Sequence, residues 1–143
     1  MEHGAIGETY VAALRHGLVA FPDATLVGVV RRPTGWLRSV TDENVPALAP
    51  PADLLDETEA RHEDLAMAGM CDEGAHNAAW EEVGFEDRYR DHLHDPKPQA
   101  ALDALERRLR DGEDVVLVCF EGENERCHRR LLQSILETRL NAG

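Results

Sequence analysis

Two short apolar runs constrain the fold of this chain more than any other feature. Residues 25–30 read TLVGVV, and residues 114–120 contain the run VVLVCF. Strands that are apolar without alternation are buried on both faces, which is typical of parallel sheets. Segments with helical periodicity lie between the two runs. The sequence therefore predicts an α/β fold, a small Rossmann-like layer domain with a mostly parallel sheet flanked by helices.

Two strands are too few for a stable sheet, so one or two further strands are expected. The segments that could contain them are residues 1–9, 36–50 and 70–80. The first of these shows no clear strand pattern. Prolines keep residues 33–52 irregular, and this segment is expected to be loop-like, with Trp36 and Val40 packed inward.

The remaining segments show helical spacing of their apolar residues. Helices are predicted at residues 10–19, 52–70, 77–93, 96–111 and 127–140. Gly84 interrupts the third of them and weakens its continuity. No repeat or linker divides the chain, so residues 1–143 are interpreted as a single α/β domain.

The charge balance limits the classes of partner. The chain has 28 acidic and 15 basic residues, a formal charge of −13, and Lys97 as its only lysine. Such an acidic domain repels nucleic-acid phosphates and anionic membranes at long range, which argues against both partners except through a local arginine patch. The composition is typical of a halophilic protein in a salt-rich cytosol, where screening still permits local arginine clusters to bind anions.

The sequence also favours a cytoplasmic location. No apolar run approaches the roughly 20 residues that span a bilayer, and the first ten residues lack the features of a secretion signal. An odd number of cysteines, three, is then expected to be reduced thiols. No cofactor is expected, and the oligomeric state is not predicted.

Chemistry-bearing residues follow both apolar runs. Ligands of open parallel sheets bind beyond the carboxyl ends of the strands, where Arg31 and Arg32 follow the first run. The second run continues into the segment VVLVCFEGENERCHRR, whose helix begins near Cys127 and His128. A helix amino end favours anions and lowers a thiol pKa. Cys127 is therefore the candidate nucleophile and His128 its base, while Arg129 joins the two earlier arginines as an anion clamp.

Each of these residues also has a structural interpretation. Cys119 lies inside an apolar run and is expected to be a core residue. Cys127 is as readily a packed residue as a reactive one, and Arg129 and Arg130 could pair with nearby glutamates. A zinc site from the two cysteines and His128 would need a fourth ligand, for which Cys71 or His76 is available, but the spacing is wrong and no metal is expected. The cysteine-phosphatase, dinucleotide and ATP-binding motifs are absent.

The strand pattern CxE followed by CHR at a helix start resembles the hallmark of the domain of unknown function 488 (DUF488) family. VVRRP at residues 29–33 resembles the first-strand pattern of that family, and FEDRY at residues 85–89 resembles its tyrosine-containing segment. The resemblance covers residues 9–138 and suggests a haloarchaeal-type acidic member. It implies a Rossmann-like domain of microbial cytosols without a settled activity. The matching motif positions are Arg31, Tyr89, Cys119, Glu121, Cys127, His128 and Arg129.

Two functions are consistent with this pattern. In the first, Arg31, Arg32, Arg129 and Tyr89 bind a small anion such as a nucleotide or phosphorylated metabolite. Cys127, His128 and Glu121 then supply the chemistry, with Glu121 orienting His128 or an arginine. In the second, the protein is a non-catalytic module for a partner protein or nucleic-acid end. Its cysteines are then packed, and Glu121 pairs with Arg31 or Arg129. The sequence does not decide whether the protein is an enzyme.

Overall fold

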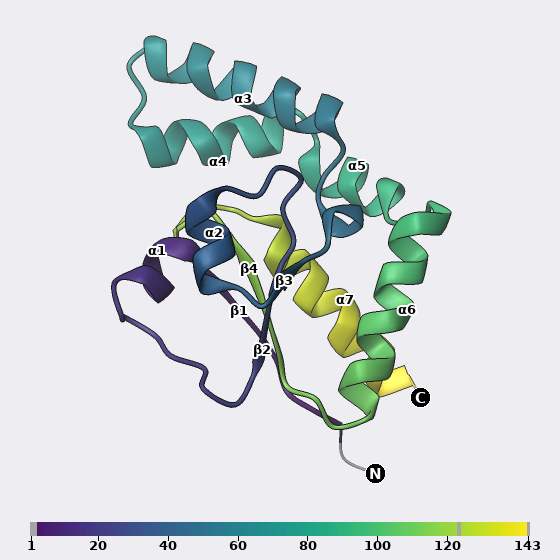
Figure 1. The fold of residues 1–143 in the computed structure, drawn as a ribbon. Helices are drawn as coiled ribbons and strands as arrows, with labels where there is room; N and C mark the ends of the chain where they lie inside the picture. The colour runs from purple at the N-terminus through teal and green to yellow at the C-terminus, as the bar shows by residue number, and fades with distance from the viewer. Residues whose placement is uncertain (1–2, 123, 143) are drawn as a thin grey trace.

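The computed structural model describes residues 3–122 and 124–142, and its centre is a four-stranded parallel sheet (Figure 1). The strands are β1 (Ile6–Tyr10), β2 (Thr25–Gly28), β3 (Glu43–Asn44) and β4 (Val115–Cys119), in the order β1-β4-β2-β3. All three pairings are parallel. Every residue of β4 is buried, as its unbroken apolar run predicts. The predicted α/β fold with a parallel sheet is confirmed.

The two additional strands lie within two of the segments that the sequence left open. β1 occupies residues 6–10, although its sequence, IGETY, has no apolar run, because it is an edge strand that pairs only with β4. β3 is a two-residue edge strand beside β2. An edge strand is buried on fewer sides than a central one, so its sequence carries a weaker signal.

The loop prediction for residues 33–52 is wrong for part of that segment. Besides β3, it contains the helix α2 (Gly35–Val40), capped by the Thr34 side chain, and the short 3₁₀ helix η1 (Pro46–Leu48). Trp36 is 60% exposed, so the expectation that it packs inward is wrong. The guanidinium of Arg15 stacks on its ring at 3.5 Å. Val40 packs against the core as expected.

Helices cover both faces of the sheet. The short helix α1 (Val11–Arg15) lies with α2 on one face. On the other face lie α5 (Phe85–His92), α6 (Pro96–Arg110) and α7 (His128–Ala142). The single helix predicted at residues 77–93 is two, because Gly84 adopts a left-handed conformation with φ of 66°. β4 faces both layers: Leu117 packs in one core cluster and Val118 in the other.

A helical hairpin formed by α3 (Ala52–Met67) and α4 (Asp72–Glu82) lies over the carboxyl edge of the sheet (Figure 1). It contacts the loop that follows β4. His76 Nε2 lies 2.8 Å from the carbonyl oxygen of Arg126, and the Asn77 side chain accepts a hydrogen bond from the Arg126 amide at 2.9 Å. The α3–α4 hairpin therefore forms a roof over the edge where ligands of parallel sheets bind. Within the described residues, no helix has the length and apolar character needed to cross a membrane.

Candidate functional site

The carboxyl edge of the sheet brings together the two groups of residues that the sequence singles out. Because β2 and β4 are hydrogen-bonded neighbours, Arg31 and Arg32 lie near the segment that follows β4. Two adjoining cavities occur here, of about 160 and 370 Å³. Five residues line both of them: Arg32, Leu55, Asp56, Glu121 and His128. The roof of both cavities comes from α3, and the larger one also reaches α4.

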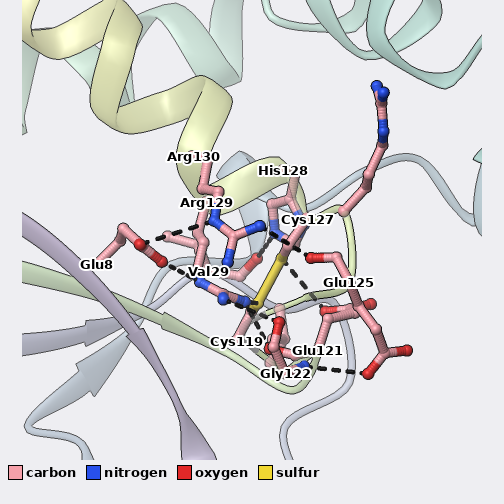
Figure 2. The surroundings of a disulfide bond; sticks show 12 residues. Glu8, Val29, Cys119, Glu121, Gly122, Glu125, Cys127, His128, Arg129 and Arg130 are labelled. Atoms are coloured by element: carbon pink, nitrogen blue, oxygen red, sulfur yellow. Dashed lines mark hydrogen bonds and ion pairs between the residues drawn. A yellow bond between two sulfur atoms is a disulfide. The ribbon is translucent and has the colours of Figure 1, made fainter. Parts of the chain in front are cut away.

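Cys119 and Cys127 form a disulfide next to Glu121 and His128, two residues that line both cavities (Figure 2). Cys119 ends β4 and Cys127 immediately precedes α7, with Cα atoms 7.7 Å apart. Both are buried, and neither lines the two cavities. The sequence predicts three reduced thiols, so this pairing corrects that expectation. The two cysteines are eight positions apart in the chain, and sequence spacing does not reveal that they meet. Cys71 is exposed and free.

Two proton acceptors flank the sulfur of Cys127. Glu121 Oε2 lies 3.2 Å from Sγ, and His128 Nδ1 lies 3.6 Å from it. His128 Nε2 is 2.6 Å from the carbonyl oxygen of Val29, which can only accept, so the ring proton is placed on Nε2. Nδ1 is then free to accept a proton. Both acceptors therefore lie within reach of the proton that Cys127 carries in its thiol form, and the roles of Cys127 as nucleophile and His128 as base stay a prediction.

Burial lowers the pKa of His128 below its usual value. The negative charge of Glu121 and the hydrogen bond to Val29 oppose this shift, and the charge of Arg129 adds to it. Desolvation is the largest of these causes, because a buried imidazolium loses its hydration. The side chain is therefore neutral near pH 7, the form in which it can act as a base.

The lowered pKa of His128 makes the stability of the protein depend on pH. Below the usual histidine pKa of about 6.5, the unfolded chain binds a proton at this side chain that the folded chain does not. Stability should therefore fall as pH drops below about 6.5, by up to about 1.4 kcal/mol per pH unit. Urea unfolding at a series of pH values, with His128→Gln as the comparison, measures this. An identical pH dependence in the variant would contradict the prediction.

Arg129 is separated from the other arginines of the predicted anion clamp. Its side chain is 1% exposed and lies beside Glu8 (Figure 2), in a separate hollow that Tyr10 also lines. It pairs with Glu8 and donates to Cys119 Sγ and the carbonyl oxygen of Glu121, both at 2.7 Å. The structure thus gives Arg129 a positioning role for the loop and the disulfide. It lines neither of the two cavities.

Arg31 and Arg32 both line the smaller cavity, and Arg32 also lines the larger one. Arg31 Nε donates to the carbonyl oxygen of Pro50 at 2.8 Å, which leaves its terminal amino groups available. Arg32 is exposed, and in the described part of the chain its side chain forms neither a hydrogen bond nor an ion pair. These two side chains are the cationic groups from the predicted set that the structure brings together.

Tyr89 packs against His128 and lines neither cavity. It is fully buried, and its hydroxyl donates to the carbonyl oxygen of Leu48. Its ring packs edge-on against His128, with the ring centroids 5.4 Å apart. Burial raises the pKa of its hydroxyl well above 10, so the group remains a hydrogen-bond donor. The position of Tyr89 supports the His128 ring and offers no contact to a ligand in these cavities.

Two residues that the sequence analysis did not single out hold the site in place. Glu8, in β1, is the ionic partner of Arg129. Asn44, at the end of β3, accepts from the Val30 amide at 3.1 Å and donates to the Val30 carbonyl oxygen at 2.9 Å. The local signal for Glu8 is an acidic residue two positions from both Ile6 and Tyr10 in the segment IGETY. Asn44 carried no signal, because its role depends on where β3 pairs.

One group of side chains at this site has metal-ligand chemistry. Within the described residues, Cys119, Glu121 and Cys127 place their donor atoms within 4.8 Å of one another. Two sulfurs and a carboxylate are donors that zinc accepts. In this structure the two sulfurs are bonded to each other, and Arg129 Nη1 donates to the sulfur of Cys119. The alternative ligands Cys71 and His76 are not part of this group.

Comparison with known proteins places the chain in a family. A search of curated proteins and a search of solved structures each found no match. A family model described as the active DUF488-N3 subclade matches residues 15–140. This match includes both arginines after β2, Tyr89 and the whole CxE…CHR segment, and leaves out β1. The chain therefore belongs to the DUF488 family.

Proposed function

We propose that the protein binds a small anion, such as a nucleotide or phosphorylated metabolite, at the carboxyl edge of its sheet and acts on it through the thiol of Cys127. The observation that carries this proposal is the arrangement of Glu121 and His128. Both side chains line the two cavities, and both lie within 3.6 Å of the sulfur of Cys127. Arg31 and Arg32 provide positive charge along the same cavities.

The anion-binding part of the proposal rests on the two arginines. Guanidinium groups bind phosphate and carboxylate through paired hydrogen bonds, and a desolvated cavity strengthens such contacts. Arg32 has no partner within the described residues, so it does not have to break an existing ion pair to bind a ligand. Asp56 and Glu121 line the same cavities and limit the negative charge that a ligand can carry.

The chemical part of the proposal applies to the reduced protein. Once an external thiol reductant has supplied the two electrons and two protons that open the disulfide, the Cys127 thiol can transfer its proton to Nδ1 of neutral His128 or to Glu121, which leaves a thiolate. Tyr89 and the Val29 carbonyl oxygen fix the imidazole so that Nδ1 faces this thiol. The subclade that the chain matches is described as active, which agrees with a preserved site.

A non-catalytic binding module is the second candidate. The ion pair of buried Arg129 with partly exposed Glu8 and the burial of both cysteines favour it, because they are features of a rigid structural cluster. The ionic partner in that cluster is Glu8, whereas the sequence suggested Glu121. In this function the arginine edge would bind a partner protein or nucleic-acid end, and the thiols would be inert.

Phosphate binding and thiol reactivity test the proposal together. We expect inorganic phosphate to bind the wild-type chain, and Arg32→Gln to weaken that binding about tenfold, since a charge-assisted hydrogen bond contributes about 1.5–3 kcal/mol. Arg107→Gln, which changes an exposed arginine on α6, is the matched control. After reduction, Cys127 should react with iodoacetamide faster than exposed Cys71 at pH 6–7, where a free thiol of pKa about 8.5 is mostly protonated.

The outcomes separate the two candidates. Slow alkylation of Cys127 together with Arg32-dependent phosphate binding would contradict the nucleophile and support the binding module. Equal phosphate binding by wild type and Arg32→Gln would overturn the anion site. Isothermal titration calorimetry and peptide mapping by mass spectrometry provide the two measurements.

A further inference from the structure

The two cavities at the carboxyl edge differ in chemical character. The smaller one has apolar walls, formed by Val30, Pro50, Ala52, Leu55 and Phe120. The larger one is lined by polar side chains of α3 and α4, among them Thr58, Glu59, His62 and His76, and also by the largely buried rings of Trp80 and Phe85. Arg32, Asp56 and Glu121 line both and so lie where the cavities join. A ligand that fills both cavities therefore meets apolar walls in the smaller one and a mixture of polar and aromatic groups in the larger one.

Phe120 is an exposed aromatic residue that lines the smaller cavity. It directly follows β4, whose five residues are all buried, yet its own side chain is 42% exposed. The other large exposed apolar side chains of the described chain line neither of the two cavities: Leu18, Val19, Trp36, Met67 and Met70. An aromatic face left open at a cavity wall is suited to stack on a planar ring.

The volume of the smaller cavity sets the size of that ring. A cavity of about 150 Å³ with apolar walls accommodates benzene. The 160 Å³ cavity therefore fits a single aromatic ring, and an anionic group attached to that ring has to extend toward Arg32 and the larger cavity. Between them, the carboxylates of Asp56 and Glu121 can accept hydrogen bonds from hydroxyl groups of the ligand.

We infer that the ligand is a single-ring nucleoside monophosphate or a molecule with the same three parts. The ring stacks on Phe120 in the smaller cavity, the hydroxyl groups of the sugar face Asp56 and Glu121, and the phosphate binds Arg32. This inference rests on the proposed function, because it uses the same anion site. The inference adds an aromatic ring to the ligand, which binding at the anion site alone does not require.

Calorimetric titration of the full chain with uridine 5′-monophosphate and ribose 5-phosphate tests the inference. Stacking of a base on an aromatic side chain contributes about 1–3 kcal/mol, so the nucleotide should bind about tenfold more tightly than the sugar phosphate. Phe120→Ala should remove that difference and leave ribose 5-phosphate binding unchanged, while Phe120→Tyr should retain it. Trp36→Ala removes another exposed aromatic ring, which lines neither cavity, and is the matched control.

The outcomes distinguish failure of ring binding at Phe120 from failure of the anion site. Equal affinities for the two ligands, with no effect of Phe120→Ala, would overturn the ring inference and leave the anion site standing. Binding of neither ligand would overturn the proposed function as well. A loss in Phe120→Ala that extends to ribose 5-phosphate would also contradict the inference, because it would show that Phe120 supports the cavity and does not contact the ring.

Discussion

Replacing Arg129 with alanine should destabilise the protein by about 3 kcal/mol, the low end of the cost of breaking a buried ion pair, because Arg129 is buried and Glu8 only partly so. The variant leaves the Glu8 carboxylate with Arg130, at 3.7 Å, as its remaining ionic partner. It also removes the donor from the carbonyl oxygens of Glu121 and Gly122, which anchor the loop between the two cysteines. The free energy of unfolding, measured by urea denaturation, reports this loss.

Two comparisons make the Arg129 prediction specific. Arg129→Lys retains the charge but not the planar fork of donors, so its loss should be smaller than that of alanine and still measurable. Arg107→Ala removes an exposed arginine without a partner in the described structure and should change stability by less than about 0.5 kcal/mol. A similar, small loss in Arg129→Ala and Arg107→Ala would show that Arg129 is not a structural anchor.

Replacing Asn44 with alanine should cost about 2–4 kcal/mol and weaken anion binding in the same variant. The Asn44 side chain pairs with both the amide and the carbonyl group of buried Val30, and leaving such a group unpaired costs about 1–3 kcal/mol. Val30 is the residue before Arg31, so the backbone that carries both arginines loses its anchor. The decrease in phosphate affinity, measured under conditions where the variant is folded, follows from that displacement.

The control for Asn44 is Asn141→Ala, which changes an exposed asparagine near the end of α7. Asn44→Asp retains the acceptor for the Val30 amide and loses the donor to its carbonyl oxygen, so its loss of stability should be intermediate. Gly28 leaves room for the Asn44 side chain, because a Cβ atom at position 28 would lie 2.6 Å from Asn44 Oδ1. Full phosphate affinity in folded Asn44→Ala would show that this side chain does not position the arginines.

The two predictions concern one side chain that the sequence motif singles out, Arg129, and one that it does not, Asn44. The motif predicts that Arg129 contacts an anionic ligand. The structure instead buries it against Glu8, which lies 121 positions earlier in the chain. Asn44 lay in a segment expected to be loop. In each case the role depends on which strands are neighbours, and local spacing does not contain that information.

Elements with local signals are predictable from the sequence alone. The apolar runs at residues 25–30 and 115–120 identify central parallel strands, because only burial on both faces favours them. Helical spacing identified α3, α6 and α7 to within a few residues. The CxE…CHR pattern, together with VVRRP and FEDRY, suggested the family that the match over residues 15–140 shows, and its position after a buried strand indicated the edge of the sheet where the candidate site lies.

The grouping of these residues depends on contacts between elements that are far apart in the chain. The parallel order β1-β4-β2-β3 brings Arg31 and Arg32 to the cavities and Arg129 to Glu8 of β1, outside them. The return of the loop after β4 brings Cys127 to Cys119, and the α3–α4 hairpin encloses the cavities. These contacts join residues that are distant in the chain. The free energy of packing selects them, and no short sequence pattern records that selection.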